Sequence, residues 1–115
     1  HPDGLSRLVR EMPAGIGFNY DPGNLKAVNP TDESCALELV EGRVNYCHLK
    51  DWRPVGEGWI ACAPGDDDLN YGALLPEIKF EGPYLIEYEP LEDTLDGIRR
   101  SLAYLERCGY ELNFS

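Results

Sequence analysis

The chain has 115 residues, enough for one small domain, and its 21 acidic and 10 basic residues give a net charge of −11 at pH 7. This charge argues against binding to a nucleic-acid backbone, which depends on lysine and arginine, and it favours a solvated surface or a site for cations. The sequence has no apolar run of the roughly 18–20 residues that span a bilayer. We therefore expect neither a nucleic-acid nor a membrane partner.

Hydrophobic periodicity predicts helices and strands in alternation along the chain. The predicted helices are residues 4–12, 32–41, 71–80 and 94–107, and the predicted strands are residues 16–20, 44–49 and 83–89. Residues 21–24 (Asp-Pro-Gly-Asn) predict a turn, and residues 52–70 predict a long loop of the kind that is usually functional. Pro76 is expected to restrict or bend the third helix. Such alternation implies a parallel sheet with helices packed on it, an α/β fold.

The cysteines are widely and irregularly spaced. The four of them, Cys35, Cys47, Cys62 and Cys108, contain no CxxC pair. This spacing is not typical of a structural zinc site or a disulfide framework, which are the less favoured alternatives. We predict reduced cysteines that pack in the interior of a cytoplasmic protein.

Each of the three predicted strands ends in a side chain suited to metal ligation. Asp21 follows the first strand, His48 ends the second, and Glu87 is near the end of the third. The carboxyl ends of parallel strands share one edge, so these residues can converge there. Carboxylate and imidazole groups suit a divalent cation. We therefore predict a site for one divalent metal ion, with Glu89, on the same strand face as Glu87, either beside it or solvated.

Other polar residues near the strand ends are candidate substrate ligands. Asn24 can bond a substrate hydroxyl, Lys50 and Asp51 can position or protonate a substrate, and Arg53 can reach an anionic or polyol substrate. Each has a structural alternative. Asn24 can simply shape the turn, Lys50 and Asp51 can form an ion pair, and Arg53 can lie on the surface.

Several stretches of the sequence occur in a characteristic order. They are Asp21-Pro22-Gly23-Asn24, His48-Leu49-Lys50-Asp51, Pro64-Gly65-Asp66, residues 82–87 and residues 97–102. In this order they closely resemble the xylose isomerase-like TIM-barrel superfamily, which contains sugar phosphate isomerases/epimerases and the family 2 apurinic (AP) endonucleases. The resemblance covers essentially residues 1–115 as a single partial domain. It implies the C-terminal part of a (β/α)8 barrel, with about three parallel βα units after a leading helix.

The resemblance also implies a chemistry. Members of the family bind a divalent metal ion, often Mn, Mg, Co or Zn, and move a proton at the carbon next to a sugar carbonyl. Asp21, His48 and Glu87 match three of the metal ligands, and Glu87 matches one of two catalytic glutamates. The remaining glutamate is expected upstream of His1. Many members carry a histidine where this chain has Asn24, which departs from both the epimerase and the DNA-repair patterns.

Two alternatives stay open. One is a non-catalytic fragment or binding protein on the same fold, and the other is an AP endonuclease-like nuclease, which the acidic charge disfavours. The expected ligand is a small sugar or polyol. Because a partial barrel leaves sheet edges and an apolar face open, we also expect self-association or pairing with the missing N-terminal half.

Overall fold

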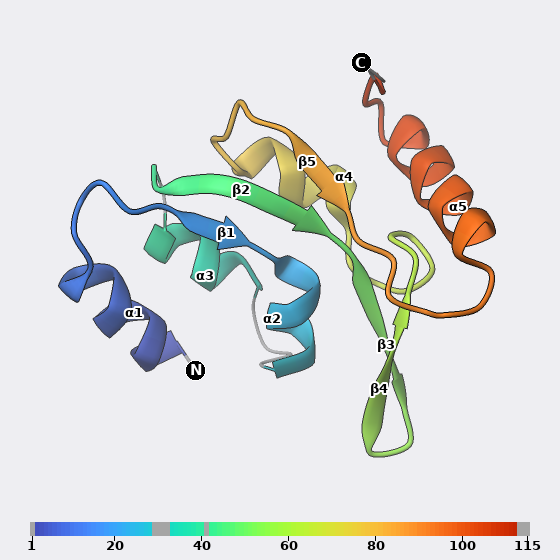
Figure 1. The fold of residues 1–115 in the computed structure, drawn as a ribbon, viewed down its shortest axis with the longest axis horizontal. Helices are drawn as coiled ribbons and strands as arrows, with labels where there is room; N and C mark the ends of the chain where they lie inside the picture. Colours follow the sequence, from blue (N-terminus) through green and yellow to red (C-terminus); the bar gives the residue numbers. More distant parts are fainter. Residues whose placement is uncertain (1, 29–32, 41, 113–115) are drawn as a thin grey trace.

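A parallel sheet of three short strands is the centre of the computed structural model, which describes residues 2–28, 33–40 and 42–112. The strands are β1 (Phe18–Tyr20), β2 (Val44–Leu49) and β5 (Tyr84–Ile86), in the order β1-β2-β5. In the central strand, Tyr46 pairs with Asn19 and His48 pairs with Leu85. All three strands run in the same direction, so their carboxyl ends share one edge (Figure 1). The predicted parallel α/β fold is confirmed.

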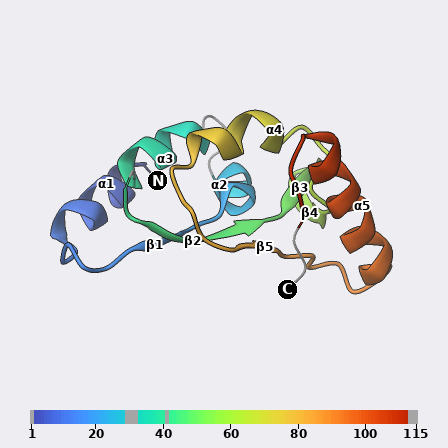
Figure 2. The same ribbon diagram turned by 90° about the horizontal axis from the view of Figure 1, so that it is seen from above.

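Helices cover one side of this sheet. They are α1 (Pro2–Glu11), α3 (Glu33–Val40), α4 (Tyr71–Leu74), which continues into the short 3₁₀ helix η1 (Leu75–Glu77), and α5 (Thr94–Arg107). Figure 2 shows them along one side of the sheet, while the other side carries no helix among the described residues. Strand side chains alternate accordingly. Tyr20, Cys47 and Leu49 are buried in the core, whereas Tyr46 and Leu85 are exposed.

The predicted turn at residues 21–24 is in fact the start of a helix, α2 (Pro22–Val28). The backbone N–H of Asn24 donates to Asp21 Oδ1 (2.8 Å), and that of Leu25 donates to the carbonyl of Asp21 (3.1 Å). Asp21 therefore caps the helix, and Pro22 occupies its first position, where a missing N–H costs nothing. The prediction was wrong because Asp-Pro at a turn and Asp-Pro at a helix start have the same sequence signature.

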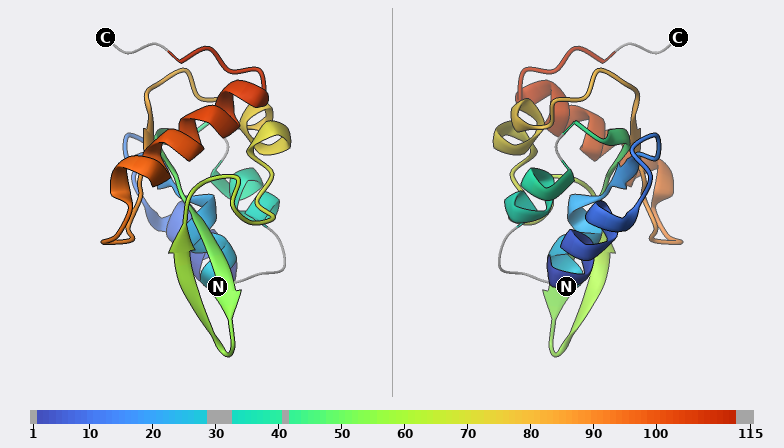
Figure 3. Two further views of the ribbon diagram at one scale, coloured as in Figure 1. Left: turned by 90° about the vertical axis from the view of Figure 1, so that its right-hand side faces the viewer. Right: turned by 90° about the vertical axis from the view of Figure 1, so that its left-hand side faces the viewer.

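The predicted loop over residues 52–70 contains a β-hairpin. Its strands are β3 (Asp51–Val55) and β4 (Gly58–Cys62), which pair antiparallel through a two-residue connection. Gly56 opens this connection with φ of 59°, a left-handed conformation that favours glycine. Figure 3 shows the hairpin projecting from the body of the protein. The loop prediction was wrong for these residues, because the glycines and Pro54 concealed two short strands.

The other elements differ from prediction mainly in length. The helix predicted over residues 71–80 is only α4 and η1, since Pro76 lies in the 3₁₀ turn and cannot continue an α-helix hydrogen-bond ladder. The third strand is also shorter than predicted. The last helix matches its predicted bounds.

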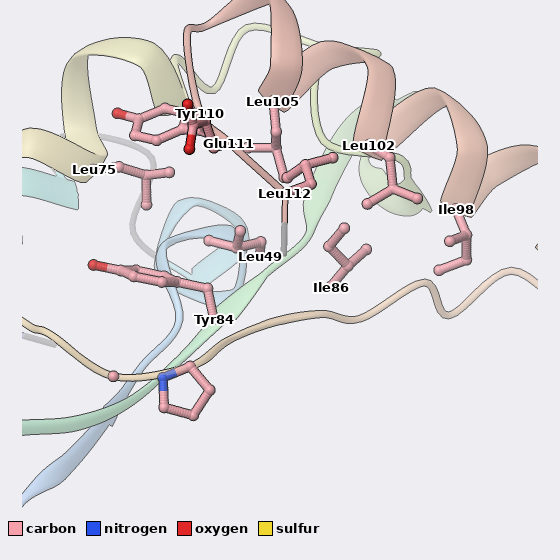
Figure 4. Close-up of a pocket in the computed structure, with 12 residues that line it drawn as sticks. Leu49, Leu75, Tyr84, Ile86, Ile98, Leu102, Leu105, Tyr110, Glu111 and Leu112 are labelled. Atoms are coloured by element: carbon pink, nitrogen blue, oxygen red, sulfur yellow. The ribbon is translucent and has the colours of Figure 1, made fainter. Parts of the chain in front are cut away.

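A largely apolar cavity of about 660 Å³ lies between the end of the sheet and α5 (Figure 4). Leu49 and Ile86 line it from the sheet, and Ile98, Leu102 and Leu105 line it from α5. Glu111 is its one carboxylate among the lining residues. With so few polar groups, this cavity is poorly suited to acid–base or metal chemistry.

The cysteines whose side chains the structure describes are free thiols. Burial raises the pKa of Cys47 and of Cys62 to about 12, so both stay protonated and unreactive, whereas Cys108 is partly exposed. The side chain of Cys35 lies outside the described part. Among the described residues, no helix is both long and apolar enough to cross a membrane.

Candidate metal centre

Asp21, His48 and Glu87 meet at the carboxyl edge of the sheet. One ligand atom from each residue can be chosen so that all three atoms lie within 4.8 Å of one another. His48 Nδ1 is 2.8 Å from Glu87 Oε2 and 3.7 Å from Asp21 Oδ2. Asp21 follows β1, His48 is the penultimate residue of β2 and Glu87 follows β5, so the parallel topology accounts for their convergence.

Local backbone structure holds each of these side chains in place. Asp21 is the cap of α2, and its Oδ2 also accepts a bond from Asn24 Nδ2 (2.7 Å). The backbone N–H of Glu87 donates to the carbonyl of Leu49 (3.0 Å), which fixes Glu87 beside the end of β2. His48 lies on the central strand, and the side-chain Nδ2 of Asn19 is 3.4 Å from each of the two ring nitrogens of His48.

A buried lysine faces the same group. Lys50 Nζ is 2.6 Å from Glu89 Oε1, 2.8 Å from Glu87 Oε2 and 3.5 Å from Asp21 Oδ2. Burial alone would lower the pKa of Lys50, but the contacts with Glu87 and Glu89 outweigh it and raise that pKa. The Lys50 ammonium lowers the pKa of Glu87, while burial raises the pKa of Asp21. Glu89 therefore lies beside the site through its contact with Lys50, with its side chain 37% exposed.

The residues present fit a divalent cation. Glu87 Oε2 is buried, and although His48 and Lys50 approach it at ion-pair distance, it has no hydrogen-bond partner of good geometry among the described residues. Such an oxygen has lone pairs to offer a metal ion. The separations of 2.8 and 3.7 Å from His48 Nδ1 to the two carboxylates are also shorter than twice a typical metal–ligand bond of about 2.1 Å. The three side chains could therefore share one ion after small adjustments.

The four predicted substrate ligands have different surroundings in the structure. Asn24 is exposed beside Asp21, and its Oδ1 accepts a bond from Trp52 Nε1 (3.2 Å). Lys50 points into the group of ligands, as described above. Asp51 is instead fully buried, with contacts to Lys26 and to the backbone N–H of Trp52. Arg53 is exposed on β3, on the hairpin face opposite Trp52.

Two buried residues that hold Lys50 and its neighbour Asp51 had no clear signal in the sequence. Tyr71 is fully buried, and its hydroxyl accepts from the backbone N–H of Lys50 (3.0 Å) and donates to the carbonyl of Lys50 (2.7 Å). Lys26 is buried in α2 and forms ion pairs with Asp51, Asp67 and Asp68. A tyrosine at the start of a predicted helix and a lysine in a predicted loop give no hint of such contacts.

Comparison with known proteins extends this description. No family model matches the chain, and no curated protein matches it significantly. Among solved structures, the chain is similar to a xylose isomerase domain protein from Planctomyces limnophilus, with 27% identity and a TM-score of 0.77. The match covers 93% of this chain and 43% of that chain, so this chain spans less than half the length of its relative. The fold of this chain is therefore that of a partial TIM barrel of the xylose isomerase-like type, corresponding to the C-terminal portion of such a barrel.

Proposed function

We propose that this chain is part of a divalent-metal-dependent sugar or sugar phosphate isomerase/epimerase, which moves a proton at the carbon next to a carbonyl group. The convergence of Asp21, His48 and Glu87, on a fold similar to a xylose isomerase domain protein, supports this proposal. The metal is Mn, Mg, Co or Zn, because mixed carboxylate and imidazole ligands accept several cations. The free thiols of the described cysteines agree with a reducing compartment, and we propose the cytoplasm.

In this proposal each residue has a defined task. Asp21, His48 and Glu87 would hold the cation, which would supply polarisation of the carbonyl of a bound sugar. Glu87 would also take up and return the proton, since its Oε2 lies 2.8 Å from both His48 Nδ1 and Lys50 Nζ. Lys50 and Asn24 lie beside this group and donate hydrogen bonds to substrate oxygens. A small sugar or polyol is the expected substrate.

Replacing Glu87 by glutamine is expected to weaken Mn²⁺ binding at least about tenfold, because even the partners of metal ligands contribute that much to affinity. Calorimetric titration of the chain with Mn²⁺ measures this change. Glu81→Gln is the matched control, since Glu81 is an exposed carboxylate outside the group, and His48→Ala should reproduce the loss. An absence of saturable binding by the unmodified chain would contradict the metal centre.

The reaction class can be tested separately. Aldoses and ketoses are incubated in D₂O with the Mn²⁺-loaded protein, and deuterium at the carbon next to the carbonyl is followed by NMR. Incorporation that Glu87→Gln abolishes is the expected result. Metal binding without any incorporation would favour the alternative, a binding protein on the same fold.

We also propose that the open side of the sheet is covered in solution, by a second copy or by an N-terminal half-barrel. Neither edge strand, β1 or β5, pairs further within the described ranges. Tyr46 and Leu85 are 38% and 43% exposed on the open side, which is unusual for a parallel sheet. The isolated chain should therefore self-associate in light-scattering measurements. A monodisperse monomer at high concentration is the result that contradicts this expectation.

A further inference from the structure

The ammonium group of Lys50 lies where it must interact with any cation held by the site. The Lys50 side chain is only 4% exposed, and its Nζ lies among three carboxylates, those of Asp21, Glu87 and Glu89. Two of these carboxylates belong to the candidate metal centre. Lys50 Nζ and His48 Nδ1 also approach the same oxygen, Glu87 Oε2, at 2.8 Å each.

The backbone of Lys50 is held by contacts with Tyr71 and Gly23, so its side chain starts from a fixed position. The Tyr71 hydroxyl bonds both the N–H and the carbonyl of Lys50. Gly23 packs so closely that a Cβ there would lie 2.7 Å from Lys50 Cγ. Lys50 directly follows β2, and its side chain extends toward the carboxylates, so it is not a solvated surface lysine that happens to lie nearby.

The charges of this group can be counted directly. Three carboxylates carry −3 and one ammonium carries +1, so the group carries −2 when His48 is neutral. A divalent cation neutralises this charge, whereas a trivalent cation overshoots it. At the same time the ammonium repels any incoming cation at short range, and this repulsion is large where water is partly excluded.

We propose that Lys50 sets the charge of the metal centre, lowering its affinity for cations and matching it to a divalent ion. The inference rests on the proposed function, since it presupposes that Asp21, His48 and Glu87 hold a cation. Lys50 is in this sense a positioning residue that acts through the carboxylates. Glu89, which is not among the proposed ligands, contributes to the same balance through its contact with Lys50.

The test compares Mn²⁺ and Tb³⁺ binding by the unmodified chain, Lys50→Met and Lys50→Arg, using calorimetry. Methionine keeps the length of the side chain without its charge, so Lys50→Met should bind Mn²⁺ about tenfold more tightly and Tb³⁺ more tightly by a larger factor. Lys50→Arg should bind like the unmodified chain. Lys79→Met, which removes the same charge at an exposed position, is the matched control.

A second variant changes the charge in the opposite direction. Glu89→Gln removes one negative charge from a partly exposed side chain and leaves the proposed ligands intact, so it should weaken Mn²⁺ binding. It decides the question even when Lys50→Met fails to fold, which circular dichroism would reveal. If the unmodified chain binds Mn²⁺ but neither variant changes the affinity in the stated direction, this inference is wrong. If the unmodified chain binds no Mn²⁺, both the proposed function and this inference are wrong.

Discussion

Replacing Lys26 by methionine is expected to lower the free energy of unfolding by about 3–5 kcal/mol, the usual effect of breaking a buried ion pair. Lys26 Nζ lies 2.9 Å from Asp51 Oδ1, 2.7 Å from Asp67 Oδ2 and 2.6 Å from Asp68 Oδ1. Asp51 is fully buried, and its Oδ2 has no hydrogen-bond partner among the described residues. Without Lys26, this carboxylate keeps its burial and loses its counter-charge.

Urea unfolding followed by circular dichroism measures the loss, with a matched control on the surface. Arg7→Met breaks an ion pair to Glu11 whose side chains are 73% and 62% exposed, and it should cost less than about 1 kcal/mol. Adding Asp51→Asn to Lys26→Met should recover part of the stability, because the unpaired charge is then gone. A double variant no more stable than Lys26→Met would show that packing, not charge, causes the loss.

The same variant should show a characteristic pH dependence. Burial already raises the pKa of Asp51 in the folded protein, and Lys26 opposes that shift. In Lys26→Met the folded-state pKa rises further above its unfolded value of about 3.9. A raised pKa contributes stability at low pH that is lost as the pH rises through the folded value. The stability difference from the unmodified chain should therefore be largest near pH 7. It should shrink as the pH falls to about 4–5, because Asp51 then becomes protonated as the pH approaches its unfolded-state pKa of about 3.9.

The elements that sequence patterns predicted well are those with a complete local signal. The last helix has apolar residues at helical spacing, and β2 is a short run of apolar, β-branched and aromatic residues, so both were found. The hairpin of β3 and β4 was missed because it lies at the edge of the fold, where Pro54 and the flanking glycines are tolerated. Helix α2 was missed because Asp21-Pro22 fits a turn and a helix start equally well.

In the candidate site, too, the sequence predicted some residues and missed others. The rule that parallel strands end at one edge was enough to select Asp21, His48 and Glu87, and the structure places them together. The partners of Lys26 could not be found that way, because a lysine on a short helix normally faces water. Only the tertiary arrangement brings it to Asp51, Asp67 and Asp68 from two other segments.

Replacing Gly23 by alanine is expected to lower the free energy of unfolding by about 3 kcal/mol, near the upper end of the usual cost of overpacking. A Cβ at this position would lie 2.6 Å from the carbonyl oxygen of Lys50, 2.7 Å from Lys50 Cγ and 3.0 Å from the carbonyl carbon of Lys50. That carbonyl is part of the buried backbone and is held by the Tyr71 hydroxyl (2.7 Å). The backbone cannot move aside cheaply, so α2 must shift instead.

A shift of α2 also moves a metal ligand, which makes this variant informative about the site. Asp21 caps α2 through the N–H of Asn24, so displacing the helix separates Asp21 from His48. Mn²⁺ binding should weaken at least about tenfold in Gly23→Ala, in the range seen when the supports of metal ligands are lost. Urea unfolding and calorimetry on the same sample measure both effects. Gly4→Ala, in α1 with nothing within 4 Å of the added Cβ, should change neither property adversely. Unchanged Mn²⁺ affinity in a destabilised Gly23→Ala would mean that Asp21 does not hold the cation.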